Sequence, residues 1–352
     1  MSHSDNQQNV RADHVYLSGF GFVPNEDPLH FGERRLKRSS VVIGSGLLLL
    51  LVLPFLLSAP VGRFLSLLTD MGVLVNGTGF YTSMWELEDE ASELLLLLLS
   101  YTPVLLLLEG LLRPSALASR TPTPFRYRTA FCALLMTMGM TAFCIFCSGL
   151  MQDMLRQVRL LELTPGNPVP TSMAAYILYL FRVTVAAAVL DEILFRGIIL
   201  QSLRRHDDAF ALLFSAICTG LVRYTLTNDL SGFVMGLVFG YFFLRTNSLS
   251  TVICCHIAAN LLTPFISTLQ HIISGPYSSV IRWSVLLVAI AAGLVGFALF
   301  CRWNRNAFIL STNSRDSLSF RSRLTISLLT VPMVGAVLGW VLMLFYHMDW
   351  II

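Results

Sequence analysis

Long runs of apolar residues, separated by short polar connections, constrain most strongly how this chain can fold. Residues 39–62 carry no charged side chain, and about 20 helical residues are enough to cross the ~30 Å hydrocarbon core of a bilayer. Only 13% of the residues are charged, about half the share that is usual in a soluble domain. The pattern predicts an all-α, polytopic integral membrane protein.

Apolar segments of this kind recur along the chain and predict eight or nine transmembrane helices. Their approximate ranges are 40–60, 94–112, 128–150, 173–200, 209–227, 230–244, 249–269, 283–301 and 325–346. The pair 209–227 and 230–244 decides between the two counts, because the second segment is short and rich in glycine.

Basic residues are concentrated in alternate connections between these segments: before the first, between the second and third, after the fourth and the sixth, and before the last. Cytoplasmic loops carry such an excess, so we expect a cytoplasmic N-terminus and, with nine spans, a C-terminus outside. The acidic run at 86–93 then falls in an outer loop, which we expect to be a solvated surface. Residues 1–38 are polar and lack the apolar core of a signal peptide, so the first span is expected to stay in the membrane, here a bacterial plasma membrane.

Three ionisable side chains stand together in the apolar fourth segment. These are Asp191, Glu192 and Arg196. A charge inside hydrocarbon costs a few kcal/mol or more, so such residues usually serve a function. Glu192 and Arg196 are four residues apart, which on a helix brings guanidinium and carboxylate together. The segment predicts a helix from about 173 to 205 with the carboxylates in its cytoplasmic half. The alternative is a buried salt bridge that only fixes helix packing.

A second polar pair lies in the seventh segment, where His256 and Asn260 are also four residues apart. The spacing places both on one helix face. Both side chains can donate hydrogen bonds to a developing oxyanion. The pair is therefore a candidate for stabilising a reaction intermediate.

Taken in order, these motifs resemble those of the CPBP intramembrane endopeptidases, which include the Rce1-type CAAX prenyl proteases and the bacterial Abi proteins. The resemblance covers about 173–270, and its three motifs are Asp191-Glu192-x-x-x-Arg196, Phe214-x-x-x-Cys218 and His256-x-x-x-Asn260. It implies hydrolysis of a membrane-associated or lipidated protein or peptide by a water that a glutamate activates. It also implies that the histidine and asparagine of the last motif stabilise the oxyanion.

The resemblance suggests a division of the chain into four parts. These are a polar cytoplasmic segment (1–38), N-terminal transmembrane helices with the outer loop (39–170), a protease-like membrane core (171–275) and C-terminal transmembrane helices (276–352). The implied partners are the lipid bilayer and a membrane-associated protein or peptide substrate. No nucleic acid and no cofactor is expected, and the oligomeric state stays open.

The sequence departs from the family pattern at two positions. The first motif normally begins Glu-Glu, but Asp191 precedes Glu192, and the second motif normally ends in histidine where this chain has Cys218. A carboxylate one methylene shorter changes the geometry of a general base. A thiol, whose pKa in water is ~8.5, is a poor substitute for imidazole. Three alternatives follow. Glu192 is the base, supported by Asp191 and Arg196, or Cys218 is a nucleophile with His256, or hydrolysis is lost.

Other function classes remain open from the sequence. A family member without catalysis would be a membrane scaffold or immunity-type protein. A transporter would also bury charges, although such proteins commonly show paired repeats that this chain lacks. A zinc site would need ligands from the set Glu192, Cys218, Cys255 and His256, which suit the metal but lack a close ligand spacing. No metal is therefore expected.

Overall fold

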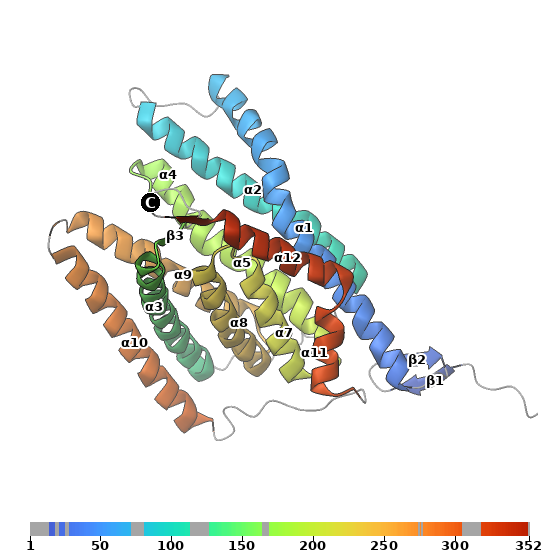
Figure 1. Cartoon of the computed structure of the whole chain (residues 1–352). Helices are drawn as coiled ribbons and strands as arrows, with labels where there is room; N and C mark the ends of the chain where they lie inside the picture. The colour runs from blue at the N-terminus through green and yellow to red at the C-terminus, as the bar shows by residue number, and fades with distance from the viewer. Residues whose placement is uncertain are drawn as a thin grey trace, which may run out of the picture.

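The computed structural model describes residues 14–17, 21–24, 28–71, 81–112, 127–163, 169–273, 275, 277–304 and 318–350. Helices dominate these residues (Figure 1). The first helices are α1 (Pro28–Asp70), α2 (Tyr81–Leu112) and α3 (Tyr127–Gln157). The later ones are α7 (Asp208–Leu221), α8 (Leu226–Thr246), α9 (Leu249–Ile272), α10 (Tyr277–Trp303), α11 (Phe320–Leu328) and α12 (Val331–Tyr346).

One continuous helical stretch between α3 and α7 changes its winding along its length. It comprises α4 (Met173–Leu180), the π-helical turns η2 (Phe181–Ala186), the short α5 (Ala187–Glu192), the π-helical turns η3 (Ile193–Leu200) and α6 (Gln201–Leu203). We call the whole stretch, residues 173–203, the motif helix. Its extent agrees with the helix predicted from about 173 to 205. Its π turns were not predicted.

Among the described residues, four short strands form two small antiparallel sheets. Strand β1 (His14–Leu17) pairs with β2 (Gly21–Pro24), next to the start of α1. Strand β3 (Leu160–Glu162) pairs with β4 (Met348–Trp350), with Leu161 opposite Asp349. The second sheet ties the chain after α3 to the chain after α12.

Helix length and composition give seven candidate membrane spans within the described residues, or eight if α11 and α12 are counted as one bent span. The fold class predicted from the sequence, an all-α polytopic membrane protein, is confirmed, and so is a count of eight at the upper limit. A ninth span is not supported. α11 and α12, predicted as one helix at 325–346, meet at an angle of 70°.

The predicted span that the structure does not support is the one at 209–227, where α7 lies. Helix α7 has 14 residues, which rise about 21 Å and are too few to cross the hydrocarbon core. It ends before a tight turn in which Tyr224 has a positive φ of 66°. The next helix, α8, begins earlier than predicted and has 21 residues. Prediction placed the boundary wrongly, because the apolar run continues through the turn.

Helices α7 and α8 form an antiparallel hairpin whose open ends meet. Arg204, before α7, donates to Asn247, after α8, at 3.3 Å. The chain therefore returns after α8 to the side that it left at the end of the motif helix. The predicted grouping of basic connections on one side is compatible with this path. The connections after α2 and before α11 lie largely outside the described residues, and both the sidedness and the four-part division stay predictions.

The predicted solvated loop at 86–93 is wrong. These residues form the first part of α2, and the side chain of Glu90 is only 1% exposed. Glu90 accepts a hydrogen bond from Arg182 Nε at 2.8 Å, so a residue of the motif helix draws this carboxylate into the protein. The first helix also begins earlier than predicted, so that the four basic residues between positions 34 and 38 lie on α1.

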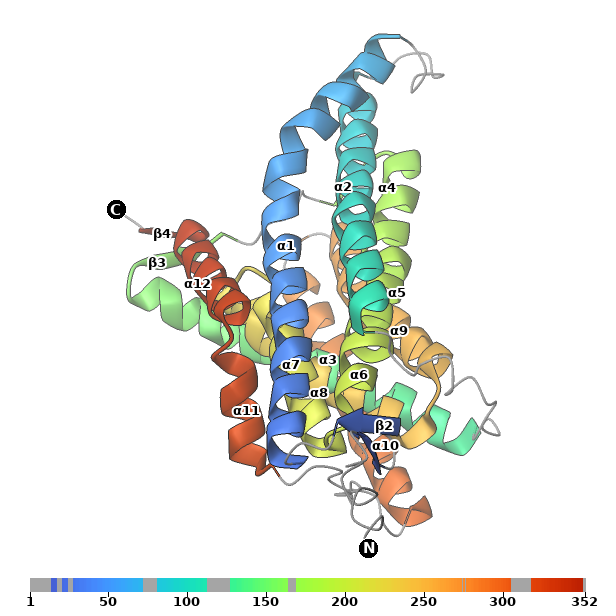
Figure 2. The same cartoon turned by 90° about the vertical axis from the view of Figure 1, so that its right-hand side faces the viewer.

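The helices gather around a core to which α1, α2, the motif helix, α7, α8 and α9 all contribute. Figure 2 shows α1, α2 and the motif helix side by side, and α11 and α12 lie against α1. Phe195 of the motif helix and Phe214 of α7 are both fully buried. By contrast, α10 exposes Leu287 and Val288 by 65% and 70%, as expected of a surface that faces lipid.

Helices α3 and α10 approach each other most closely at two glycines. A Cβ atom on Gly139 would lie 2.5 Å from Cα of Gly293, closer than real Cβ atoms come. Small residues allow such close packing of helices in a membrane. The α3–α10 contact therefore depends on the absence of side chains at this crossing.

We predict that Gly139→Ala lowers thermal stability in detergent, because overpacking costs about 1–3 kcal/mol. Gly110→Ala on α2 is the matched control, since a Cβ there would have nothing within 4 Å. Melting temperatures of the purified proteins measure the effect. Equal melting temperatures for Gly139→Ala and the control would contradict the tight crossing.

Candidate active site

The motif helix carries the first predicted motif at the junction of two kinds of helix. Ser172 caps its start by accepting a hydrogen bond from Ala175 N at 3.4 Å. Glu192 is the last residue of α5, and η3 begins at the next residue. π turns are rare and frequently occur at functional sites. The change of winding at Glu192 therefore marks this position as unusual for structural reasons alone.

Glu192 is the centre of a buried hydrogen-bonding cluster. Its side chain is fully enclosed. Its Oε1 accepts a hydrogen bond from Arg196 Nη1 at 2.9 Å, and Nδ1 of His256 lies 2.7 Å from the same oxygen. An ionised carboxylate can only accept hydrogen bonds, so Nδ1 acts as the donor to it. Within the described residues Oε2 has no hydrogen-bond partner.

Two further contacts hold the donors of this cluster in place. Arg196 also donates from Nη2 to the carbonyl oxygen of Gly236, on α8, at 3.2 Å. The ring of Phe239 stacks on the His256 ring with centroids 4.5 Å apart. The motif helix, α8 and α9 thus meet at Glu192.

Asp191 belongs to a different set of contacts from its neighbour Glu192. Its Oδ1 accepts a hydrogen bond from Tyr101 Oη at 2.6 Å, and its Oδ2 accepts one from Arg223 Nη2 at 2.7 Å. Both oxygens are therefore occupied, and the residue is 1% exposed. Successive helical residues point about 100° apart, which explains why Asp191 faces α2 and the α7–α8 turn while Glu192 faces α9.

Sequence reasoning missed Tyr101 and Arg223. Each left a signal: Tyr101 interrupts a leucine-rich run, and Arg223 falls inside a segment that was predicted to span the membrane. An arginine within an apolar segment calls for a partner, but the sequence does not say which carboxylate supplies it.

The last motif is divided between two contacts. His256 reaches Glu192, whereas Nδ2 of Asn260 donates to the backbone carbonyl of Val183 at 3.0 Å. Val183 lies in η2, so Asn260 binds a carbonyl of the wider π-helical turns. Their spacing predicted that both lie on one face of the helix; both contact the motif helix, but they bind it at points nine residues apart.

The second motif lies on α7, which packs against η3 of the motif helix. Ser215 Oγ, three residues before Cys218, donates to the carbonyl of Phe195 at 2.9 Å. Cys218 and Phe214 are fully buried. Phe214 packs against Phe210, with ring centroids 5.7 Å apart.

A further buried ion pair, at a distance from Glu192, joins α2 to the motif helix. Arg182 Nε lies 2.8 Å from Glu90 Oε2, and its Nη1 lies 4.0 Å from Glu93 Oε2. The Arg182 guanidinium also lies 5.8 Å from the centre of the Tyr179 ring. This pair supplies the partner that an arginine in a membrane helix requires.

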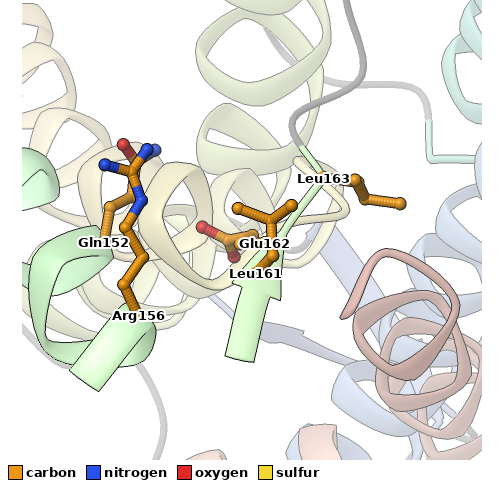
Figure 3. A pocket seen from close by; sticks show the side chains of 5 residues that line it. All are labelled: Gln152, Arg156, Leu161, Glu162 and Leu163. Carbon is orange, nitrogen blue, oxygen red and sulfur yellow. The ribbon is translucent and has the colours of Figure 1, made fainter. Parts of the chain in front are cut away.

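The cluster around Glu192 is closed in this structure. Glu192 and Arg196 are fully buried and His256 is 4% exposed, whereas the Arg223 side chain is 33% exposed. A pocket of ≈ 310 Å³ lies elsewhere, between the end of α3 and β3. Figure 3 shows its lining by Gln152, Arg156, Leu161, Glu162 and Leu163. A substrate would reach Glu192 only after the surrounding helices move.

The possible zinc ligands do not form a metal-binding group. Among the described residues, no three His, Cys, Asp or Glu side chains come together as ligands of one ion would. Glu192 and His256 bind each other directly instead. The ligand set considered from the sequence is therefore not assembled.

The fold and the buried cluster define a polytopic integral membrane protein with a polar centre inside its helical bundle. Comparison with protein families is more specific: residues 173–262 match the model of the family described as type II CAAX prenyl endopeptidase Rce1-like. The match covers about a quarter of the chain and includes all three motifs. The family resemblance of this segment, predicted from those motifs, is confirmed. No curated protein and no solved structure matches the chain.

We predict that Arg196→Leu strongly destabilises the protein, because it leaves the Glu192 carboxylate buried with its main cation removed. Breaking a buried pair in this way costs about 3–5 kcal/mol. The exposed pair of Arg156 and Asp153, 3.8 Å apart, provides the control, since Arg156→Leu should change stability little. Thermal unfolding in detergent compares the two variants. Similar small losses would mean that the Glu192–Arg196 contact contributes little to the fold.

Proposed function

We propose that this protein is an intramembrane endopeptidase that cleaves a membrane-associated or lipidated protein or peptide. The observation that carries the proposal is the asymmetry of the Glu192 carboxylate. Arg196 and His256 both bind Oε1, while the buried Oε2 has no partner among the described residues. A fixed carboxylate with one free oxygen is suited to accept a proton from water.

In the proposed reaction, Glu192 Oε2 takes a proton from a water molecule as the water oxygen attacks the carbonyl carbon of the scissile peptide. The electrons of the carbonyl π bond move to the carbonyl oxygen, which becomes negatively charged. Collapse of this intermediate breaks the C–N bond, and the proton held by Glu192 passes to the leaving nitrogen. The products are a carboxylic acid and an amine. Arg196 holds the base in place throughout.

The residues proposed for the oxyanion are His256 and Asn260. His256 donates from Nδ1 to Glu192, so it can also donate from Nε2 to the oxyanion only as the imidazolium, which carries an N–H on both ring nitrogens. Asn260 uses one N–H for the Val183 carbonyl and carries a second. Hydrogen-bond donors fixed before the reaction stabilise the developing charge without a cost of reorganisation.

Asp191 has a different proposed role from Glu192. Both of its oxygens already accept hydrogen bonds, from Tyr101 and Arg223. A carboxylate in this state is a poor acceptor for a further proton from water. We therefore assign the base to Glu192 and a supporting role to Asp191.

The location of the reaction is part of the proposal. Arg204 and Arg245 are among the basic residues at the end of the bundle where the motif helix ends. This excess of basic residues favours a cytoplasmic position for that end and for the N-terminus. We propose a bacterial plasma membrane and a substrate that reaches Glu192 from the cytoplasmic side.

The second motif supports an alternative function. Cys218 stands where the family motif carries an imidazole, and the cluster around Glu192 is closed. Both features fit a relative that has lost hydrolysis and acts as a membrane scaffold or immunity-type protein. The two functions differ in whether Glu192 is needed as a base or only as part of the packing.

We expect the purified protein in lipid vesicles to cleave members of a library of prenylated and unprenylated peptides. Glu192→Gln should lower the rate by about 10²–10⁴-fold, because it removes the general base, and His256→Ala should also abolish cleavage. Glu109→Gln is the matched control, because Glu109 is an exposed carboxylate near the end of α2. No cleavage by the wild type would refute the protease, and full activity of Glu192→Gln would refute the assignment of the base.

We also expect Cys218→His to raise the cleavage rate, because it restores the imidazole that the second motif of the family carries. The same peptide assay measures the effect, and Cys218→Ser controls for loss of the thiol. Cleavage by Cys218→His in the absence of wild-type cleavage would favour the scaffold function. Abolished cleavage in Cys218→Ser, with the fold retained, would instead favour the cysteine as a nucleophile.

A further inference from the structure

The turn between α7 and α8 carries an arginine that reaches into the cluster. Arg223 lies between the end of α7 and a residue with positive φ, Tyr224. Its backbone N–H donates to the carbonyl of Gly220 at 3.1 Å, which directs the chain out of the helix. Its side chain then extends to Asp191 Oδ2. The backbone of a tight turn thus places this guanidinium.

A tyrosine from outside the segment that matches the family completes the contact. Tyr101 lies on α2, and its hydroxyl donates to Asp191 Oδ1 at 2.6 Å. The 2.6 and 2.7 Å contacts of Asp191 are both short, as hydrogen bonds to an ionised carboxylate are. Helix α2 and the α7–α8 turn therefore bind the same side chain from different directions.

We propose that Tyr101 and Arg223 are positioning residues that fix the rotation of α5 and so aim Glu192 at His256. This inference rests on the proposed function for its effect on rate, but its geometric part can be tested without any activity. Each residue acts through Asp191.

The physical reason lies in the helix geometry. Asp191 and Glu192 are joined by one peptide bond and project about 100° apart, so a rotation of α5 that moves one carboxylate moves the other. The helix on either side of α5 has π-helical turns, whose winding differs from that of an α-helix. Contacts from other helices are needed to set the orientation of the six residues between them.

Charge balance gives a second reason. Asp191 and Glu192 place two negative charges side by side, and Arg196 neutralises the second. Arg223 supplies the remaining positive charge. The second motif, with Cys218 in the place of an imidazole, contributes no cation. Without Arg223, Asp191 would lose the cation that binds it directly, and a buried carboxylate that loses its cation is strongly unfavourable in a protein interior.

The geometric test uses His256 as a reporter, because its Nδ1 binds Glu192 directly. Full-length protein labelled with ¹⁵N-histidine is studied by NMR in lipid nanodiscs, and the His256 signals are identified by their loss in His256→Gln. We expect Arg223→Gln and Tyr101→Phe to shift the His256 ring-nitrogen signals. Arg223→Lys should leave them close to wild type, since a single N–O contact joins Arg223 to Asp191.

The matched control removes another buried ion pair from the same helix. Arg182→Gln breaks the Arg182–Glu90 contact, nine residues from Asp191. It should lower stability without shifting the His256 signals. If Arg223→Gln leaves these signals unchanged, or if Arg182→Gln shifts them equally, the positioning role is refuted.

The kinetic test separates positioning from substrate binding. We expect Arg223→Gln to lower kcat by about 10- to 100-fold with little change in KM, because a small misplacement of a catalytic group costs up to about 10²-fold. Arg223→Lys should recover most of the loss. A changed KM with unchanged kcat would overturn the assignment. A wild type without cleavage would refute the proposed function alone, because the NMR measurement still decides whether Arg223 and Tyr101 orient Glu192.

Discussion

Several of the charged side chains inside this helical bundle form ion pairs, and the contacts between its elements depend on those pairs. A buried carboxylate without its cation is unfavourable by several kcal/mol. Three pairs join different elements: Asp191 with Arg223, Glu90 with Arg182, and Asp207 with Arg323. They connect the motif helix to the α7–α8 turn, α2 to the motif helix, and the start of α7 to α11. The fourth pair, Glu192 with Arg196, lies within the motif helix and is joined to α9 through His256.

The location of these pairs explains what could be predicted from the sequence. The Glu192–Arg196 contact follows from a spacing of four residues on one helix, which is local information. Arg223 and Tyr101 bind Asp191 across 32 and 90 residues of sequence, and no periodicity encodes such contacts. The same limit explains the error at 86–93. An acidic run suggests a solvated loop, but the partner that buries Glu90 is Arg182, 92 residues later.

The membrane helices show the same contrast between composition and packing. Long apolar runs predict α1, α3, α9 and α10 well, because a helix that faces lipid is apolar around its circumference. Composition alone could not separate α7 from these helices. Its apolar residues face protein, and its end is set by the turn at Arg223 and Tyr224, not by a change in hydropathy. The 70° break between α11 and α12 is likewise a feature of packing within an apolar segment.

Of the two departures from the family motifs, the aspartate at position 191 has contacts that explain it. A glutamate at position 191 would carry its carboxylate one methylene further, about 1.5 Å, past the positions at which Tyr101 and Arg223 now bind at 2.6 and 2.7 Å. The shorter aspartate fits a carboxylate that is held by other helices, whereas Glu192 retains the reach and the free oxygen of a base. The second motif carries Cys218 in place of an imidazole, and Arg223 binds the Asp191 carboxylate as a cation that cannot accept a proton. In the proposed reaction, the role of general base is therefore left to Glu192.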